Sequence, residues 1–337
     1  MHAIRDARHK HLLLGNGFSI ALKPDIFTYG SLYENADFSE MPNVQKLFQG
    51  LNTQDFEIVI KHLQDTATTL AIYSPDDTEL VKQLRHDASC LKDALLKAIA
   101  KRHPERPYEI EREKYIACRS FLNQFEHLFT LNYDVLLYWA LMQSEVDELR
   151  LMPDDGFRHP EDDPDQPWVS WQQSQKATVS YLHGALHLFD AGTDVTKYTW
   201  SKTDKPIIDQ IRAALEEEKY PLFVAEGSSE AKRSRILHSG YLHKALRSFE
   251  SCCASPGNAI VIYGHSLADN DQHVLRCIAR GNCSAVAVSI FGDPNSEANK
   301  AIIHQAQKLV ALRGPAKGKR TALDLILYDA SSAKVWG

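Results

Sequence analysis

The chain has 337 residues, of which 44% are hydrophobic and 24% are charged, and its formal net charge is −6. This length and composition are those of an ordinary soluble globular chain, long enough for one large domain. Acidic residues outnumber basic ones, 44 to 38, which argues against a surface dedicated to nucleic acid, so we expect no direct nucleic-acid binding.

The sequence predicts neither export nor membrane insertion. Its first segment, MHAIRDARHKH, is polar and lacks the apolar core of a secretion signal. No apolar run approaches the roughly 20 residues of a membrane span, and we expect a cytoplasmic protein. The cysteines form no Cys-x-x-Cys pair, so they are expected to be free thiols and not ligands of a zinc ribbon. They are Cys90, Cys118, Cys252, Cys253, Cys277 and Cys283.

Seven short apolar runs, each ending in a polar or glycine-containing corner, predict strands that are buried on both faces of a parallel sheet. They are residues 11–15, 126–132, 179–184, 221–227, 259–266, 285–292 and 323–330. Helical patterns separate many of them. Alternation of strand and helix predicts a single α/β domain over residues 1–337, with a doubly wound, mainly parallel, Rossmann-like sheet.

Two segments depart from this alternation. Residues 40–122 hold helical patterns and no convincing strand, which predicts a helical insertion between the first and second strands. Such an insertion could cover the ligand crevice or serve as an oligomer surface. Residues 152–171 are rich in Asp and Pro and poor in aliphatic side chains, which predicts an irregular surface loop.

The first candidate site is the corner after the first predicted strand, because an open α/β sheet binds its ligand outside the carboxyl ends of its strands. This corner, residues 15–19, reads GNGFS. Gly15 and Gly17 would let the backbone approach a phosphate, and the next helix would add its dipole. The dinucleotide fingerprint is incomplete, since Ile20 stands where the third glycine belongs. An ordinary strand-to-helix turn is the other interpretation.

The corners after the next two strands carry an amide and an imidazole. In TLNYD, residues 130–134, Asp134 is placed to cap the following helix. Asn132 could also cap, or its amide could bind a sugar hydroxyl or a water. In YLHG, His183 can act as a general base near neutral pH, or it can be structural, like most histidines. His187 would complete a metal pair, but no third ligand has the typical spacing, and we expect no metal site.

The later segments offer one further corner and one basic cluster. In YGHSL, residues 263–267, Ser266 could donate to a phosphate oxygen. Asp269 or Asp271 is expected to cap the next helix. The basic cluster around Lys232, which includes Arg233 and Arg235, is either a solvated helix face or a small basic patch.

In chain order, these corners resemble the sirtuin-like family of NAD-binding proteins. The matching motifs are GNGFS (15–19), TLNYD (130–134), YLHG (181–184), YGHSL (263–267) and SIFGD (289–293). The resemblance implies that the first corner binds the pyrophosphate, that Asn132 and His183 lie beside the nicotinamide ribose, and that the fourth corner holds the adenosine half. The nucleotide-binding residues that it implies are Gly15, Asn16, Gly17, Phe18, Ser19, Gly264, His265 and Ser266.

Two departures separate the chain from the protein-deacylating sirtuins. Those proteins carry a four-cysteine zinc module after the His-Gly motif, whereas this chain has no cysteine between Cys118 and Cys252. Their Pro-Asp-Phe-Arg run corresponds to KPDIF here, residues 23–27, without the arginine. The chain is more similar to the bacterial sirtuin-like branch of antiphage NAD hydrolases, and within it to a bacterial domain family of unknown function.

This resemblance implies an NAD glycohydrolase that consumes NAD as a substrate and keeps no recycled cofactor. Nicotinamide and ADP-ribose, or a cyclised relative, would be the products. Asn132 would orient the ribose hydroxyls or the attacking water, His183 would act as the base, and Asp134 would support Asn132. A homo-oligomer is implied, together with a partner protein such as a HerA-type ATPase or a short Argonaute. The alternatives are a non-catalytic nucleotide sensor, an interaction subunit and, last, a protein deacylase.

Overall fold

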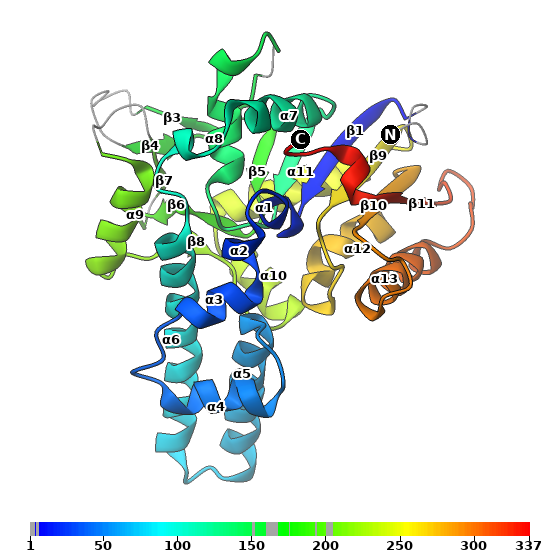
Figure 1. Cartoon of the computed structure of the whole chain (residues 1–337). Helices are drawn as coiled ribbons and strands as arrows, with labels where there is room; N and C mark the ends of the chain where they lie inside the picture. The colour runs from blue at the N-terminus through cyan, green and yellow to red at the C-terminus, as the bar shows by residue number, and fades with distance from the viewer. Residues whose placement is uncertain are drawn as a thin grey trace.

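A parallel sheet of six strands forms the centre of the computed structural model (Figure 1). The model describes residues 4, 7–149, 152–159, 168–174, 176–192, 194–199 and 205–337. In chain order the strands of this sheet are β1 (His9–Leu14), β2 (His127–Thr130), β5 (Val179–Tyr181), β9 (Asn258–Tyr263), β10 (Ala285–Ile290) and β11 (Asp324–Asp329). The predicted α/β fold with a mainly parallel sheet is confirmed.

The spatial order of the six strands is β11-β10-β9-β1-β2-β5. Counted along the chain, this is the order 3-2-1-4-5-6 of doubly wound dinucleotide-binding sheets. β1 pairs in parallel with β2 on one side and with β9 on the other. The direction of winding therefore reverses between β1 and β9, and ligands of such sheets bind in the crevice at this switch point.

Burial explains why these runs form strands. All six residues of β9 and of β10 are buried, as suits strands that are covered on both faces. α11 packs against β5 and β9, and α13 packs against β10 and β11. The helices are α1 (Gly17–Leu22), α2 (Pro24–Phe27), α3 (Tyr29–Asn35), α4 (Pro42–Gly50), α5 (Phe56–Tyr73), α6 (Thr78–Arg102), α7 (Arg112–Leu122), α8 (Leu136–Met142), α9 (Ile207–Glu216), α10 (Ser229–Leu237), α11 (Gly240–Cys253), α12 (Gln272–Arg280) and α13 (Glu297–Arg313).

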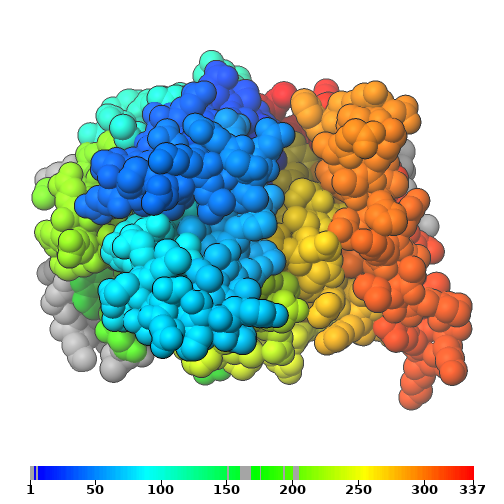
Figure 2. Space-filling view, turned by 90° about the horizontal axis from the view of Figure 1, so that it is seen from below, coloured from blue at the N-terminus to red at the C-terminus, as the bar shows by residue number. Residues whose placement is uncertain are grey.

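Between β1 and β2 the chain forms helices joined by loops, with no strand among these described residues. The helical insertion predicted over 40–122 comprises α4 to α7. Helices α5 and α6 pack against each other and project from the body (Figure 1). The side chain of Asp55 begins α5 by accepting hydrogen bonds from the amides of Glu57 and Ile58. Seen along the hairpin, the segments coloured blue to cyan lie beside the gold segment that contains α12 (Figure 2).

A second sheet, which the sequence did not predict, has the strand order β3-β4-β7-β6-β8 and antiparallel pairing. Its strands are β3 (Phe157–Arg158), β4 (Trp168–Trp171), β6 (Gly184–Asp190), β7 (Val195–Tyr198) and β8 (Pro221–Phe223). The assignment of residues 221–227 to the parallel sheet was therefore wrong, because β8 pairs with β6. The irregular loop predicted over 152–171 is corrected in part, since β3 and β4 lie inside it, and residues 160–167 fall outside the described residues.

Among the described residues, no helix combines the length and the apolar character that crossing a bilayer requires.

Candidate site at the switch point of the sheet

The strand register brings the predicted corners to one edge of the sheet. Leu14 of β1 pairs with Thr130 of β2 and with Tyr263 of β9, and Thr130 pairs with Tyr181 of β5. The residues that follow these positions leave the sheet at the same level. Asn132 and His183, each two residues beyond its paired position, therefore follow the ends of neighbouring strands.

The two glycine corners contact each other directly. The amide of Gly17 donates to the carbonyl of Gly264 (2.8 Å), and the amide of Gly15 donates to the carbonyl of Tyr263 (2.9 Å). A Cβ atom on Gly17 would lie 2.5 Å from the Cα of Gly264, and one on Gly15 would lie 2.6 Å from its carbonyl oxygen. The glycines are thus required by the close packing of the two corners, whether or not a phosphate binds beside them.

Two other residues of the first corner, Asn16 and Phe18, make contacts within the protein. Phe18 is fully buried and packs against Trp336 with ring centroids 5.0 Å apart. The indole Nε1 of Trp336 donates to the carbonyl of Phe18 (2.8 Å). The side chain of Phe18 is therefore part of the core. The side-chain Nδ2 of Asn16 donates to the backbone carbonyl of Phe27 (2.9 Å).

Ser19, Asn132 and Asp134 form a buried polar group beside this corner. Asn132 Nδ2 donates to Ser19 Oγ (3.0 Å), and Ser19 Oγ donates to Asp134 Oδ2 (2.5 Å). The other oxygen of Asp134 accepts from the amide of Leu136, the first residue of α8 (2.9 Å). Burial raises the pKa of Asp134, against the hydrogen bonds from Ser19 and Leu136. Asp134 thus makes the expected capping contact and also supports Asn132 through Ser19.

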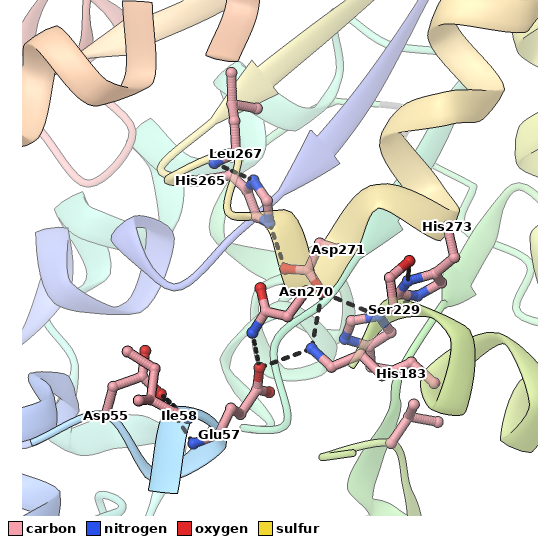
Figure 3. Close-up of polar contacts among 12 residues, drawn as sticks. Asp55, Glu57, Ile58, His183, Ser229, His265, Leu267, Asn270, Asp271 and His273 are labelled. Carbon is pink, nitrogen blue, oxygen red and sulfur yellow. Dashed lines mark hydrogen bonds and ion pairs between the residues drawn. The ribbon is translucent and has the colours of Figure 1, made fainter. Parts of the chain in front are cut away.

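A larger buried ion cluster lies at the same edge and includes His183 (Figure 3). Lys232 Nζ lies between two carboxylates, 2.7 Å from Glu57 Oε2 and 2.8 Å from Asp271 Oδ1. His265 Nε2 contacts Asp271 Oδ2 (2.9 Å). The cluster comprises Glu57 of α5, Lys232 of α10, His183 after β5, His265 after β9, Asp271 at the end of the 3-10 turn Asp269–Asp271, and His273 of α12.

The pKa values of the two carboxylates of this cluster are shifted in opposite directions. Burial raises the pKa of Glu57 to about 7, although Lys232 opposes the shift. Burial acts in the same direction on Asp271, but the charge of Lys232 and the hydrogen bond from His265 outweigh it and hold the pKa of Asp271 well below its usual value. Asp271 is therefore the ionised partner of Lys232, and Glu57 is able to exchange a proton near neutral pH.

His183 is 2% exposed, and its Nε2 lies 3.0 Å from Nε2 of His273. Burial and then the charge of Lys232 lower the pKa of His183 well below 6.5. The imidazole is therefore neutral at neutral pH and able to accept a proton. At 3.0 Å one ring nitrogen donates and the other accepts, so the two histidines share one proton along this contact.

The structure brings together a set of metal-ligand types that the sequence did not reveal. His183, Asp271 and His273 place one ligand atom each within 4.8 Å of one another. The ammonium of Lys232 already occupies Asp271 Oδ1, and a cation at this point would meet its positive charge. His187 is not part of this set: it lies between the rings of Tyr138 and Tyr181 in the second sheet.

Two predictions for the later segments are corrected, those for Lys232 and for Asp271. Lys232 belongs to neither a solvated face nor a basic patch, because it is 1% exposed, whereas Arg233 and Arg235 are exposed. The carboxylate of Asp271 makes no capping bond to α12 and instead contacts Lys232 and His265. His265 therefore faces the ion cluster, and Ser266 is exposed to solvent.

Sequence reasoning missed Glu57 and Lys232. One signal pointed to Lys232: Ser229, Lys232 and Ile236 recur at helical spacing and are the buried residues of α10. Glu57 carried no such signal. It comes from the helical insertion, and its contact with Lys232 joins residues 175 positions apart.

Strand order, switch point and edge polarity define a doubly wound α/β protein with a candidate ligand site at the carboxyl ends of its parallel strands. The chain belongs to the family described as Domain of unknown function (DUF4917), whose model matches residues 12–336. No curated protein matches the chain.

Proposed function

We propose that the protein is an NAD glycohydrolase that cleaves the bond between nicotinamide and ribose. The observation that carries the proposal is the register of β2 and β5, which brings the segments that carry Asn132 and His183 to the carboxyl ends of neighbouring strands, in a sheet with the dinucleotide-binding strand order. The resemblance to sirtuin-like NAD hydrolases supports the same residues.

Expulsion of nicotinamide from NAD needs no acid catalyst. The nicotinamide of NAD is cationic, so the bonding electron pair leaves with it and the product is neutral. The ribose passes through an oxocarbenium-like state, and a water then adds to its anomeric carbon and loses a proton. Asn132 orients the ribose hydroxyls or this water, and the neutral imidazole of His183 accepts the proton.

Glu57 adds a second proton acceptor. Its Oε1 accepts a hydrogen bond from the hydroxyl of Tyr133 (3.2 Å), the residue next to Asn132. Its Oε2 accepts from Lys232 and from Asn270. A carboxyl whose pKa is about 7 exchanges protons at neutral pH, so Glu57 can itself accept a proton released at the site.

A non-catalytic nucleotide sensor is the second candidate, and one observation favours it. The polar side chains of the site are buried and paired with one another, so a ligand must replace contacts that already exist. This closed arrangement fits a binding site that rearranges when occupied. We further propose, from the resemblance alone, a homo-oligomer that depletes NAD in antiphage defence together with a partner ATPase or Argonaute.

Nicotinamide release from NAD, followed by chromatography, tests the proposal. The full chain is compared with Asn132→Ala, His183→Ala and, as a control, His304→Ala at an exposed position of α13. We expect release by the wild type and the control, and release at least about 100-fold slower from each site variant. NAD binding, measured by calorimetry, is expected to change by less than about tenfold in the variants.

The remaining outcomes discriminate between the two candidates. Equal release by all four proteins would show that Asn132 and His183 are not catalytic. NAD binding without release by the wild type would favour the sensor. The absence of both would overturn the two candidates together.

A further inference from the structure

A cavity of about 590 Å³ lies at the edge of the parallel sheet opposite the candidate site. Residues at the amino ends of β1, β2, β5 and β9 line it, and α11 forms another wall. His11, His127 and Cys252 are among the lining residues. Nothing in the proposed NAD chemistry uses this end of the sheet.

The fold places three metal-ligand types together at this cavity. His11 of β1 pairs in register with His127 of β2, so the two imidazoles stand on neighbouring strands, with ring centroids 5.2 Å apart. Cys252 lies in the last turn of α11, which packs across β5 and β9. Each residue offers one ligand atom, and these atoms all lie within 4.8 Å of one another.

The two imidazoles present nitrogens that have no partner. Nδ1 of His11 and Nδ1 of His127 are buried and make no hydrogen bond with any described residue. His11 is only 3% exposed. An unpaired buried polar group costs about 1–3 kcal/mol, so buried polar atoms are normally satisfied. A shared ligand between the two nitrogens and the thiol would satisfy both.

Asn258 forms a second layer behind this group. Its Nδ2 lies 2.9 Å from His11 Nε2 and 2.9 Å from the carbonyl oxygen of Cys252, so one side chain orients two of the three residues. Outer groups of this kind fix the ring of a metal-bound histidine. Ligation through Nδ1 leaves the proton of His11 on Nε2. The Asn258 amide then turns so that Oδ1, which now has no partner, accepts a hydrogen bond from this Nε2–H, and the bond from Nδ2 to the carbonyl of Cys252 is lost.

We propose that His11, His127 and Cys252 bind a divalent transition metal of the zinc type. Two imidazoles and a thiolate are the donors that zinc prefers, and Cys252 loses its thiol proton when it binds. Ligand atoms around a tetrahedral zinc lie about 3.3–3.6 Å apart, so the three side chains move together by at most about 1.5 Å. Three protein ligands leave the fourth position open to the cavity, where a water or a second ligand binds.

Cobalt(II) tests the site, because a thiolate ligand gives tetrahedral Co²⁺ an absorption band that imidazole ligands do not. The purified full chain, freed of metal and kept reduced, is titrated with Co²⁺ and then with Zn²⁺. We expect one Co²⁺ per chain with a thiolate band, and loss of the band on adding Zn²⁺, which binds such sites more tightly.

Matched variants assign the ligands. Cys252→Ser removes the thiolate and is expected to abolish the band. His127→Gln, at a half-buried position, is expected to weaken Co²⁺ binding more than about 100-fold while the folded circular dichroism spectrum is kept. Cys253→Ser is the control, because Cys253 is a buried neighbour outside the group. No band in the wild type, a band that persists in Cys252→Ser, or equal loss in Cys253→Ser overturns the proposal.

Discussion

Lys232 shows how one buried charge joins distant parts of the chain. Its ammonium is 1% exposed and contacts carboxylates of α5 and of the turn before α12. Burial alone would lower the pKa of Lys232, but Glu57 and Asp271 outweigh it and hold this pKa above its ordinary value. The lysine is therefore charged at neutral pH.

Replacing Lys232 by Met is expected to destabilise the protein by about 3–5 kcal/mol, because it leaves Asp271 ionised and without its main partner. Urea unfolding measures this as a lower midpoint at an unchanged slope. Lys300→Met serves as the control, since Lys300 forms an exposed pair with Glu297 that contributes at most about 1 kcal/mol. Equal midpoints for the two variants would contradict the structural role of Lys232.

Among the individual residues of the candidate site, those that directly follow a strand could be predicted from the sequence. Asn132 and His183 could be found because each stands just after an apolar run. Glu57 and Lys232 could not, because their roles arise from contacts between helices that are far apart in the chain. A lysine beside two arginines has the composition of a solvated surface, and only its packing shows otherwise.

One of the contacts between the helical hairpin (α5 and α6) and the rest of the protein is made at a glycine. Gly227, just before α10, lies against the backbone of α5, and a Cβ atom on it would be 2.4 Å from the Cα of Lys61. Beside this contact, Lys92 of α6 pairs with Glu226 at 3.0 Å. The contact places Glu57, one turn before Lys61 on α5, over the carboxyl edge of the sheet.

Gly227→Ala is expected to destabilise the protein by about 1–3 kcal/mol, because backbone atoms would have to move to admit the methyl group. In the same variant, amide hydrogen exchange over α5 is expected to be faster, because the hairpin would pack less closely against the rest of the protein. Gly50→Ala is the matched control: it lies in α4 with no atom within 4 Å of its Cβ position, and alanine there is expected to be neutral or to stabilise by up to about 1 kcal/mol. Normal exchange over α5 in Gly227→Ala would count against this docking contact.

Among the elements, six of the seven predicted strands lie in the parallel sheet, because buried parallel strands are long apolar runs. The second sheet escaped prediction for two reasons. Only two residues, Leu182 and His183, separate the end of β5 from the start of β6, so the sequence of the two strands resembles a single apolar run interrupted at His183. β3, β4, β7 and β8 have two to four residues each, too few to show a period.

The whole molecule is expected to lose stability on mild acidification. Burial lowers the pKa of six histidines, which are His11, His103, His127, His183, His187 and His273. The values for His11, His103 and His273 fall to about 4. Such groups stabilise the fold fully above pH 6.5, and the stabilisation is lost as the pH falls toward 4, by up to about 1.4 kcal/mol per pH unit for each histidine.

Glu57 acts in the opposite direction. Its pKa is raised to about 7, so its contribution is present below pH 4.5 and is lost as the pH rises through 7. Burial also raises the pKa of Asp55, Asp93 and Asp134, so four carboxyls oppose six histidines. Thermal unfolding between pH 7 and pH 5 is therefore expected to show a falling Tm. His187→Phe should reduce this dependence by about one proton, since neither ring nitrogen of His187 has a hydrogen-bond partner among the described residues. A Tm that does not change over this range would contradict the expectation.

The contact between Trp336 and Phe18 bears on how the protein is made. Phe18 belongs to the first glycine corner, and the residue that holds its carbonyl is synthesised 318 positions later. At about 5–20 residues per second, the ribosome needs roughly 15–60 s to cover that distance. A nascent chain therefore carries an unfinished corner until the segment through residue 336 has emerged.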